Sequence, residues 1–192
     1  MRSNIIEVLF KIMTNKKNYN ELDLIKLKYG LEGSVMFFEK LIVIIVLSLL
    51  FNILYEVSFF MILYMGIKLF SGGAHAKNSS SCLFISILIF IGIPMITNFI
   101  NFDFNFKLFI SLIGFLLFYI YSPASTHKRP IQGNNNILKI KSLLILDIYC
   151  IASLMLNNNI GALIIWSVII QMFFITPFAY KVLKVPYVRR EI

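Results

Sequence analysis

The sequence predicts an all-α protein, a polytopic integral membrane helical bundle with about six membrane helices, and three observations support this fold class. Hydrophobic residues make up 59% of the 192-residue chain, and its mean hydropathy of +0.83 is far above that of soluble domains. The apolar residues form long runs separated by short polar gaps, as membrane helices do. Charged residues account for only 14% of the chain, too few to cover a water-soluble globule.

Composition also limits which partners and cofactors are expected. The net charge of +9 is spread over short loops without a basic patch or stacking platform, so we expect a lipid bilayer rather than nucleic acid as a partner. Cys82 and Cys150 lie far apart in different apolar contexts, which indicates free thiols. His75 and His127 belong to different loops, and His75 with Cys82 supplies too few ligands for a closed zinc site. We therefore expect neither a metal nor another cofactor.

Residues 1–40 predict an amphipathic helical hairpin in the cytoplasm or at the membrane interface. Apolar residues from Asn4 to Met13 crowd one broad helical face. After a polar turn, a second helix begins where Asn20 can cap it and ends where Gly30 can stop it. Two roles fit this hairpin equally: a solvated amphipathic element on the membrane, or a docking surface for a partner helix.

Six apolar runs follow, and each is expected to form a membrane helix. About 20 residues cross a hydrocarbon core of about 30 Å, so the shorter runs need extension, a thinner bilayer or partial insertion, and four to six spans are expected. Residues 41–180 should form the membrane domain, with loops at 68–81 and 122–141 and a basic tail at 181–192. The runs cover about residues 41–55, 57–70, 82–100, 106–121, 142–156 and 160–180.

The basic residues predict which side of the membrane each loop faces. If all six runs cross, every lysine and arginine except Lys107 falls on one side. By the positive-inside rule that side is the cytoplasm, so both termini and the loops at 68–81 and 122–141 are cytoplasmic in a multi-pass protein. A four-span arrangement, in which runs two and three or runs five and six dip back, keeps the same sidedness.

Three residues inside the apolar runs carry structural expectations. Pro94 is expected to kink the third run near Gly92, and Pro177 the end of the sixth. Asp147 is the one acid well inside an apolar run, so it should face the bundle interior and find a partner there. A structural polar contact is the favoured role for Asp147, ahead of a direct part in chemistry.

Chemistry is expected in the polar island from Lys68 to Cys82, between the second and third runs. Cys82 directly follows three serines, one of which can cap the helix and place the thiol in its first turn, where free N–H groups favour a nucleophilic thiolate. His75 lies seven residues earlier, which on a straight helix is about 10.5 Å along the axis and too far for proton transfer. Gly72 and Gly73 are therefore predicted to fold the chain back and bring the imidazole to the thiol.

Three short segments carry a family resemblance. Ser71–Lys77 reads Ser-Gly-Gly-Ala-His-Ala-Lys and is followed, seven residues after its histidine, by Cys82. After the fourth run, Ser122–Thr126 continues into His127–Ile131, and Tyr29–Glu32 lies near the N-terminus. Together these segments resemble the motifs of the accessory gene regulator B (AgrB) family over nearly the whole chain.

The resemblance implies a cysteine endopeptidase of bacterial quorum sensing, located in the bacterial cell membrane. Its implied substrate is an AgrD-like propeptide with an amphipathic leader, a signal core containing a cysteine, and an acidic C-terminal tail. The implied catalytic residues are Cys82, which attacks the peptide bond before the tail, and His75, which serves as base and then acid. The acyl thioester then passes to the propeptide's own cysteine and gives a thiolactone ring. Family members are thought to self-associate, so a homodimer is also implied.

Supporting roles are expected for residues near this pair. Gly73 and Ser125 belong to the motif segments, and basic side chains of the loops can attract the acidic tail. Where the family typically has an arginine seven residues before the histidine, this chain has Lys68, which keeps the charge but loses the bidentate fork. The basic residues concerned are Lys68, Lys77, Lys128 and Arg129.

No third catalytic group is evident, and two other functions compete with proteolysis. A peptide exporter would carry more ionisable residues along its spans than Asp147 alone. A non-catalytic membrane scaffold would tolerate loss of the Cys82 thiol. The candidates to orient His75 are Asn78, Ser80, Ser125 and Asp147.

Overall fold

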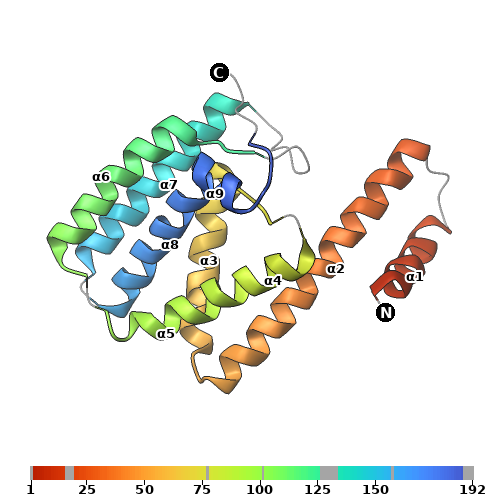
Figure 1. Ribbon diagram of the computed structural model, residues 1–192, viewed down its shortest axis with the longest axis horizontal. Helices are drawn as coiled ribbons and strands as arrows, with labels where there is room; N and C mark the ends of the chain where they lie inside the picture. The colour runs from red at the N-terminus through yellow and green to blue at the C-terminus, as the bar shows by residue number, and fades with distance from the viewer. Residues whose placement is uncertain are drawn as a thin grey trace. The chain divides into compact units, whose positions relative to one another are not determined.

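The computed structural model describes residues 2–15, 20–76, 78–100, 102–125, 134–156 and 158–187, which are mostly helical (Figure 1). Within these ranges the only β-type pairing is an isolated parallel bridge between Gly72 and Ala124. The predicted all-α class is confirmed. The elements are α1 (Arg2–Thr14), α2 (Glu21–Leu50), α3 (Leu54–Ser71), α4 (Ser79–Ile87), a π-helical turn (Leu88–Gly92), α5 (Ile93–Thr97), α6 (Phe104–Tyr121), α7 (Asn135–Met155), α8 (Asn159–Ile175) and α9 (Pro177–Val182).

The chain divides into two compact units, residues 1–47 and 48–192. The first holds α1, which confirms the predicted first helix, and most of α2. As predicted, α2 begins after Asn20, whose carbonyl accepts hydrogen bonds from the N–H groups of Asp23 and Leu24. The predicted end at Gly30 was wrong, because α2 continues through this residue as far as Leu50. A glycine inside a helix costs only about 0.5–1 kcal/mol, and no proline follows within this stretch to end the helix.

Helix α8 forms the centre of the second unit. It packs against α3, α5, α6, α7 and α9, and Figure 1 shows it between α7 and α3. Most of its side chains are buried, as expected for a helix enclosed by others. Contacts made by α8 can therefore fix the ends of several neighbouring elements. The buried residues of α8 are Gly161, Ala162, Leu163, Ile164, Ile165, Ser167, Val168, Gln171, Met172, Phe174 and Ile175.

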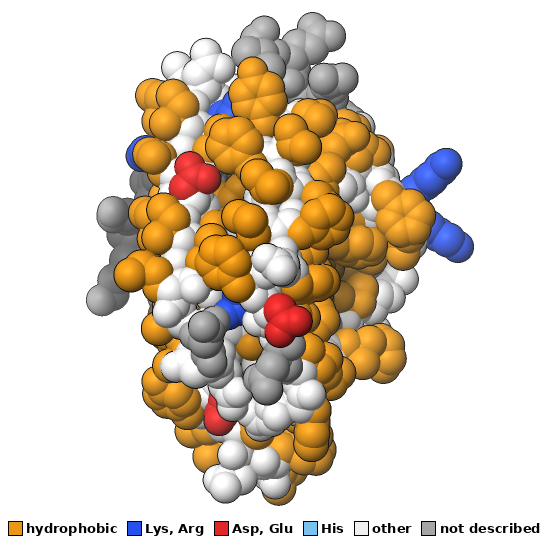
Figure 2. Space-filling view, turned by 90° about the vertical axis from the view of Figure 1, so that its left-hand side faces the viewer, with side chains coloured by type: hydrophobic (Ala, Val, Ile, Leu, Met, Phe, Trp, Pro, Cys, Tyr) orange, Lys and Arg blue, Asp and Glu red, His pale blue; other side chains and the backbone are white. Residues whose placement is uncertain are grey.

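The described helices have the lengths and composition of a membrane protein. Among the described residues, four helical stretches are long and apolar enough to cross a membrane, namely α2, α3, Ser79–Thr97 and α6, and α8 is a shorter apolar helix. Figure 2 shows hydrophobic side chains spread over the face that includes α6. Such a large apolar surface suits lipid rather than water, so the protein is embedded in a membrane. Exposed apolar residues of α6 include Phe109, Leu112, Phe115, Leu116, Tyr119 and Ile120.

Both prolines inside apolar runs coincide with irregular helix geometry. The π-helical turn Leu88–Gly92 directly precedes α5, whose second residue is Pro94. Pro177 has a larger effect than the predicted kink, because α8 stops before Thr176 and α9 starts at Pro177. Thr176 has extended backbone angles (φ −77°, ψ 148°), since proline disfavours the helical conformation of the residue before it. The sixth run therefore forms two helices rather than one.

The expectation that Asp147 faces the bundle interior was wrong. Asp147 lies on α7 with its side chain exposed. It follows Leu146, which is fully buried, and one residue along a helix turns the side-chain direction by about 100°. Polar contacts on the inner face come instead from serine hydroxyl groups, which bond to each other or to backbone carbonyls. The buried face of α7 consists of Ser142, Leu146, Cys150 and Ser153.

Lys107, the one basic residue that the charge pattern places on the outer side, has a structural role. It is buried near the start of α6. Its Nζ donates hydrogen bonds to the backbone carbonyls of Ser153 and Leu156, at 2.9 and 2.8 Å. These carbonyls lie at the C-terminal end of α7, where a cation satisfies unpaired acceptors and offsets the negative end of the helix dipole. Lys107 therefore fastens α6 to α7.

Candidate functional site

The polar island forms the connection between α3 and α4. Helix α3 ends at Ser71, and the chain then turns through Gly72 (φ 70°) and Gly73 (φ 122°). His75 follows in a non-helical stretch, and α4 begins beyond it. The predicted glycine turn is confirmed, and His75 and Cys82 do not share one continuous helix.

Gly73 cannot be replaced by a residue with a side chain without strain. Its positive φ is one that only glycine adopts readily. In addition, a Cβ at this position would lie 3.1 Å from the backbone carbonyl oxygen of Phe174. The backbone of the turn therefore runs directly against the end of α8.

The second motif segment, Ser122–Ser125, pairs with this turn. The N–H of Gly73 donates to the carbonyl of Ala124 at 2.8 Å, and the N–H of Ala124 donates to the carbonyl of Ser71 at 2.9 Å. Ala74 and Ala124 are each only 1% exposed, so water does not compete for these hydrogen bonds. Two motifs that lie far apart in the sequence therefore meet at one place.

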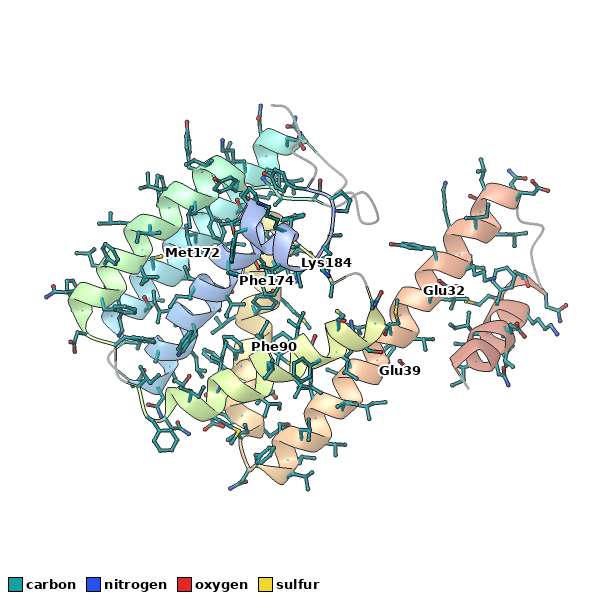
Figure 3. The ribbon with its side chains drawn as sticks, in the orientation of Figure 1. Glu32, Glu39, Phe90, Met172, Phe174 and Lys184 are labelled. Carbon is teal, nitrogen blue, oxygen red and sulfur yellow. The ribbon has the colours of Figure 1, made fainter. Side chains whose placement is uncertain are left out.

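The end of α8 provides a further anchor for the turn. The last carbonyls of a helix have no partner within that helix. Because Pro177 holds Thr176 extended, α8 stops there, and the Phe174 carbonyl accepts a hydrogen bond from the N–H of Ala74 at 2.8 Å. Figure 3 shows Phe174 at the end of α8 that approaches α9. A kink at Pro177 was predicted from the sequence, but this contact was not.

Gln171 also contacts this turn, and no sequence pattern predicted it. It is fully buried in α8. Its Nε2 donates hydrogen bonds to Ser71 Oγ at 2.6 Å and to the carbonyl oxygen of Gly72 at 2.7 Å. The available signal was an amide side chain inside the last long apolar run, since polar residues in membrane helices usually face the bundle interior. The sequence gives no sign of which distant residues it would bind.

His75 directly follows the anchored part of the turn. Its neighbour Ala74 is buried and hydrogen-bonded to α8, whereas His75 itself is half-buried. The imidazole therefore stands where the restrained backbone reaches solvent-accessible space. An anchor one residue away restricts the positions that the imidazole can adopt.

Cys82 is also half-buried and is the fourth residue of α4, in the first turn as predicted. Its N–H donates to the carbonyl of Asn78 at 3.0 Å. This is the first hydrogen bond of the helix, so the N–H groups without helical partners precede the thiol by one turn or less. The positive N-terminal end of α4 is thus within one turn of Cys82.

The expected serine cap of α4 was wrong. Asn78 occupies the cap position with extended backbone angles (φ −107°, ψ 147°), and Ser79, Ser80 and Ser81 form the first helical turn. Asparagine is as common as serine at this position, but the side chain of Asn78 makes no capping hydrogen bond here. The earlier helix start leaves Cys82 within the first turn.

Lys68 lies in the last turn of α3, close to the anchor on α8. Its Nζ donates to the hydroxyl group of Tyr64 at 3.1 Å. It also lies 5.0 Å from the ring centroid of Tyr64 and 5.2 Å from that of Phe174, within the range of cation–π attraction. Aromatic side chains therefore fix the ammonium group beside the residue whose carbonyl holds the histidine turn.

The remaining predicted residues divide by their positions. Ser125 is 4% exposed and follows the paired Ala124, so it belongs to the site region. Three other candidates to orient His75, namely Asn78, Ser80 and Asp147, are exposed. Several residues singled out in the predicted loops lie outside the described residues, namely Lys77, His127, Lys128 and Arg129.

Comparison with known proteins shows which family this chain resembles. The family model of accessory gene regulator B matches residues 4–175. The chain is 28% identical over 175 residues to accessory gene regulator protein B of Staphylococcus intermedius, covering 91% of this chain and 93% of the relative. It is 30% identical over 128 residues to accessory gene regulator protein B of Staphylococcus aureus, covering 67% of this chain and 68% of the relative. It is 30% identical over 139 residues to Protein FsrB of Enterococcus faecalis, covering 71% of this chain and 57% of the relative. No solved structure matches the chain.

Proposed function

Because the chain belongs to the accessory gene regulator B family, we propose that it is a membrane cysteine endopeptidase of quorum sensing. In this proposal it removes the C-terminal tail of an AgrD-like propeptide and promotes closure of a thiolactone ring. The observation that carries the proposal is the anchored glycine turn, which holds the residue before His75 and leads into a helix whose first turn contains Cys82. An imidazole next to an anchored backbone and a thiol on a helix suit two groups that must react together.

The proposed first step is transfer of an acyl group to Cys82. His75 takes the thiol proton, and the thiolate attacks the carbonyl carbon of the peptide bond before the tail. His75 then gives its proton to the leaving amine as the carbon–nitrogen bond breaks. The tail departs, and the propeptide remains bound to Cys82 as a thioester.

The proposed second step is exchange of one thioester for another. The thiolate of the propeptide's own cysteine attacks the acyl carbon, and the bond to Cys82 breaks. The products are a thiolactone and the regenerated Cys82 thiolate. A cysteine nucleophile suits this step because the bond formed and the bond broken are of the same kind. Formation of the first thioester from an amide is uphill, so binding or removal of the tail must offset it.

Lys68 is the proposed contact for an acidic group of the tail. Its ammonium group is held against two aromatic rings. Lys68 therefore offers a positive charge beside the histidine turn. A lysine attracts a carboxylate as a point charge, without the paired hydrogen bonds of an arginine. Lys77, Lys128 and Arg129 would add to this attraction on the cytoplasmic side.

The test is co-expression of the chain with a candidate propeptide, followed by mass analysis of the peptide products. We expect the parent protein to remove the tail, and the Cys82→Ala and His75→Ala variants to lose this activity at least 1000-fold. Cys150→Ala is the matched control, since it removes a buried thiol from α7 and should leave tail removal within about twofold.

Each outcome of this experiment separates the candidate functions. Removal of the tail by Cys82→Ala at the parental rate would overturn the protease proposal. Secretion of an intact propeptide by both the parent and Cys82→Ala would indicate an exporter. Unchanged quorum-sensing output in cells that carry the Cys82→Ala variant would indicate a scaffold.

A further inference from the structure

We propose that Gln171 is a positioning residue, whose side-chain amide clamps the histidine turn to α8 and thereby sets the place of His75 for the reaction. This inference rests on the proposed function. It assigns a role to a residue of the last long helix, about 100 residues away in sequence from the turn that it binds.

The contacts of Gln171 form a short chain of hydrogen bonds. Nε2 donates to Ser71 Oγ at 2.6 Å and to the Gly72 carbonyl oxygen at 2.7 Å. The hydroxyl group of Ser71 in turn donates to the carbonyl of Ile67 at 2.7 Å. The clamp therefore fixes both the last residue of α3 and the first residue of the turn.

The direction of the amide group follows from its partners. A backbone carbonyl can only accept a hydrogen bond, so the group facing Gly72 must be the NH₂ of Gln171. The same NH₂ group reaches Ser71, whose proton is used toward Ile67. Both protons of the amide are therefore engaged at the histidine turn.

The oxygen atom of the Gln171 amide lowers the stability of the folded protein. Gln171 Oε1 is buried and has no hydrogen-bond partner among the described residues, and burial of an unpaired acceptor is unfavourable. A methionine has nearly the same length and would fill this place in an apolar helix without that cost. The amide is therefore better explained by the two bonds that it donates than by packing of α8.

The clamp acts where the backbone needs restraint. Glycine has the greatest conformational freedom of any residue type, and two glycines, Gly72 and Gly73, lie between α3 and His75. Backbone hydrogen bonds hold Gly73 and Ala74, whereas the carbonyl of Gly72 is held by Gln171. Loss of the amide would release the first part of the turn and widen the range of positions open to the imidazole.

The chain offers a matched control on the same helix. Met172 is also buried in α8, but its sulfur lies 3.3 Å from where a Cβ would sit on Gly114 of α6. Figure 3 shows Met172 apart from Phe174 on α8. A Met172→Ala change therefore weakens the packing of α8 without touching the turn.

The test compares Gln171→Met and Met172→Ala in the full-length protein reconstituted in lipid. For Gln171→Met we expect the kcat of tail removal to fall at least tenfold, with KM within about twofold and an unchanged or higher melting temperature. For Met172→Ala we expect a lower melting temperature with kcat within about twofold. Adding Ser71→Ala to Gln171→Met should cause little further loss, because the two residues share one contact.

A second measurement does not depend on proteolysis. Hydrogen–deuterium exchange of a peptide covering residues 69–76 should be faster in Gln171→Met than in the parent, and unchanged in Met172→Ala. Unchanged exchange or an unchanged kcat in Gln171→Met would overturn the clamp. A parent protein that fails to remove the tail, yet shows the exchange difference, would overturn the proposed function and the catalytic purpose of the clamp, while leaving its structural contact in place.

Discussion

Gly73 is a residue at which the chain has little freedom to change. A side chain there would require a positive φ, at a cost of about 1–2 kcal/mol, and would press on the Phe174 carbonyl that accepts the Ala74 hydrogen bond. We predict that Gly73→Ala lowers tail removal at least tenfold by displacing His75. The measurement is the rate of tail removal per amount of membrane-inserted protein.

Gly33→Ala is the control for this change. Gly33 lies inside α2, where an added Cβ would meet nothing within 4 Å, and alanine is the better helix former. Its activity should equal that of the parent or exceed it slightly. Equal activity of Gly73→Ala and the parent would contradict the importance of the turn.

The charge of Lys68 gives a second prediction for a single residue. Lys68→Met should raise the KM for an acidic-tailed propeptide about tenfold with little change in kcat, because it removes attraction but leaves the catalytic pair. Lys68→Arg should retain most of the affinity, since the charge is kept. Steady-state kinetics with the purified propeptide will measure both parameters.

Lys139→Met is a suitable comparison for Lys68→Met. The ammonium group of Lys139 also lies over an aromatic ring, 4.3 Å from the centroid of Tyr119, but it belongs to α7 rather than to the histidine connection. Its loss should leave KM within about twofold. If neutralising the acidic tail of the propeptide fails to abolish the difference between the parent and Lys68→Met, the lysine acts otherwise than through charge.

At the scale of elements, the break between α8 and α9 prepares an acceptor for the site. We predict that Pro177→Ala lets the helix continue through Thr176, so that the Phe174 carbonyl gains a helical partner and loses Ala74. Tail removal should fall about tenfold, and exchange at residues 69–76 should become faster. Pro94→Ala, beside the π-helical turn, is the control and should leave both measurements near parental values.

Comparison of the elements with the sequence shows that hydrophobic pattern predicted the helices better than it predicted their ends. Apolar runs correctly predicted the existence of the membrane helices, because burial in lipid depends on composition over many residues. Helix ends were less predictable, since Gly30 was tolerated inside α2 and Asn78 replaced a serine as the cap of α4. The error for Asp147 arose from the rule that intramembrane acids face inward, although its position beside Leu146 on a helix indicates another face.

For the whole molecule, the sequence predicted candidate reacting groups but not the scaffold around them. His75, Cys82 and the glycine turn follow from local residue chemistry, and family resemblance added Ser122–Ser125 as a second motif. The bonds from Gln171 and Phe174 join segments about 100 residues apart. Such pairings depend on how helices pack in three dimensions, which neither spacing nor composition reveals.

The sidedness of the whole molecule remains a prediction of charge distribution, and it has a direct test. In a Cys82→Ala, Cys150→Ala background, Asp103→Cys on the α5–α6 connection should react with a membrane-impermeant maleimide in intact cells. Lys184→Cys, after α9, should react only once the membrane is permeabilised. The reverse pattern would place the histidine connection outside the cell and contradict the proposed meeting with a cytoplasmic propeptide.

The position of α8 along the chain has a consequence for the timing of activity during synthesis. A growing chain contains His75 and Cys82 long before it contains Gln171 and Phe174. Until α8 is made and packed, neither the amide donor nor the carbonyl acceptor exists to hold the turn. We expect a nascent chain that ends before α8 to be inactive in tail removal. The proposed activity would then arise only after α8 has been synthesised and packed into the membrane bundle.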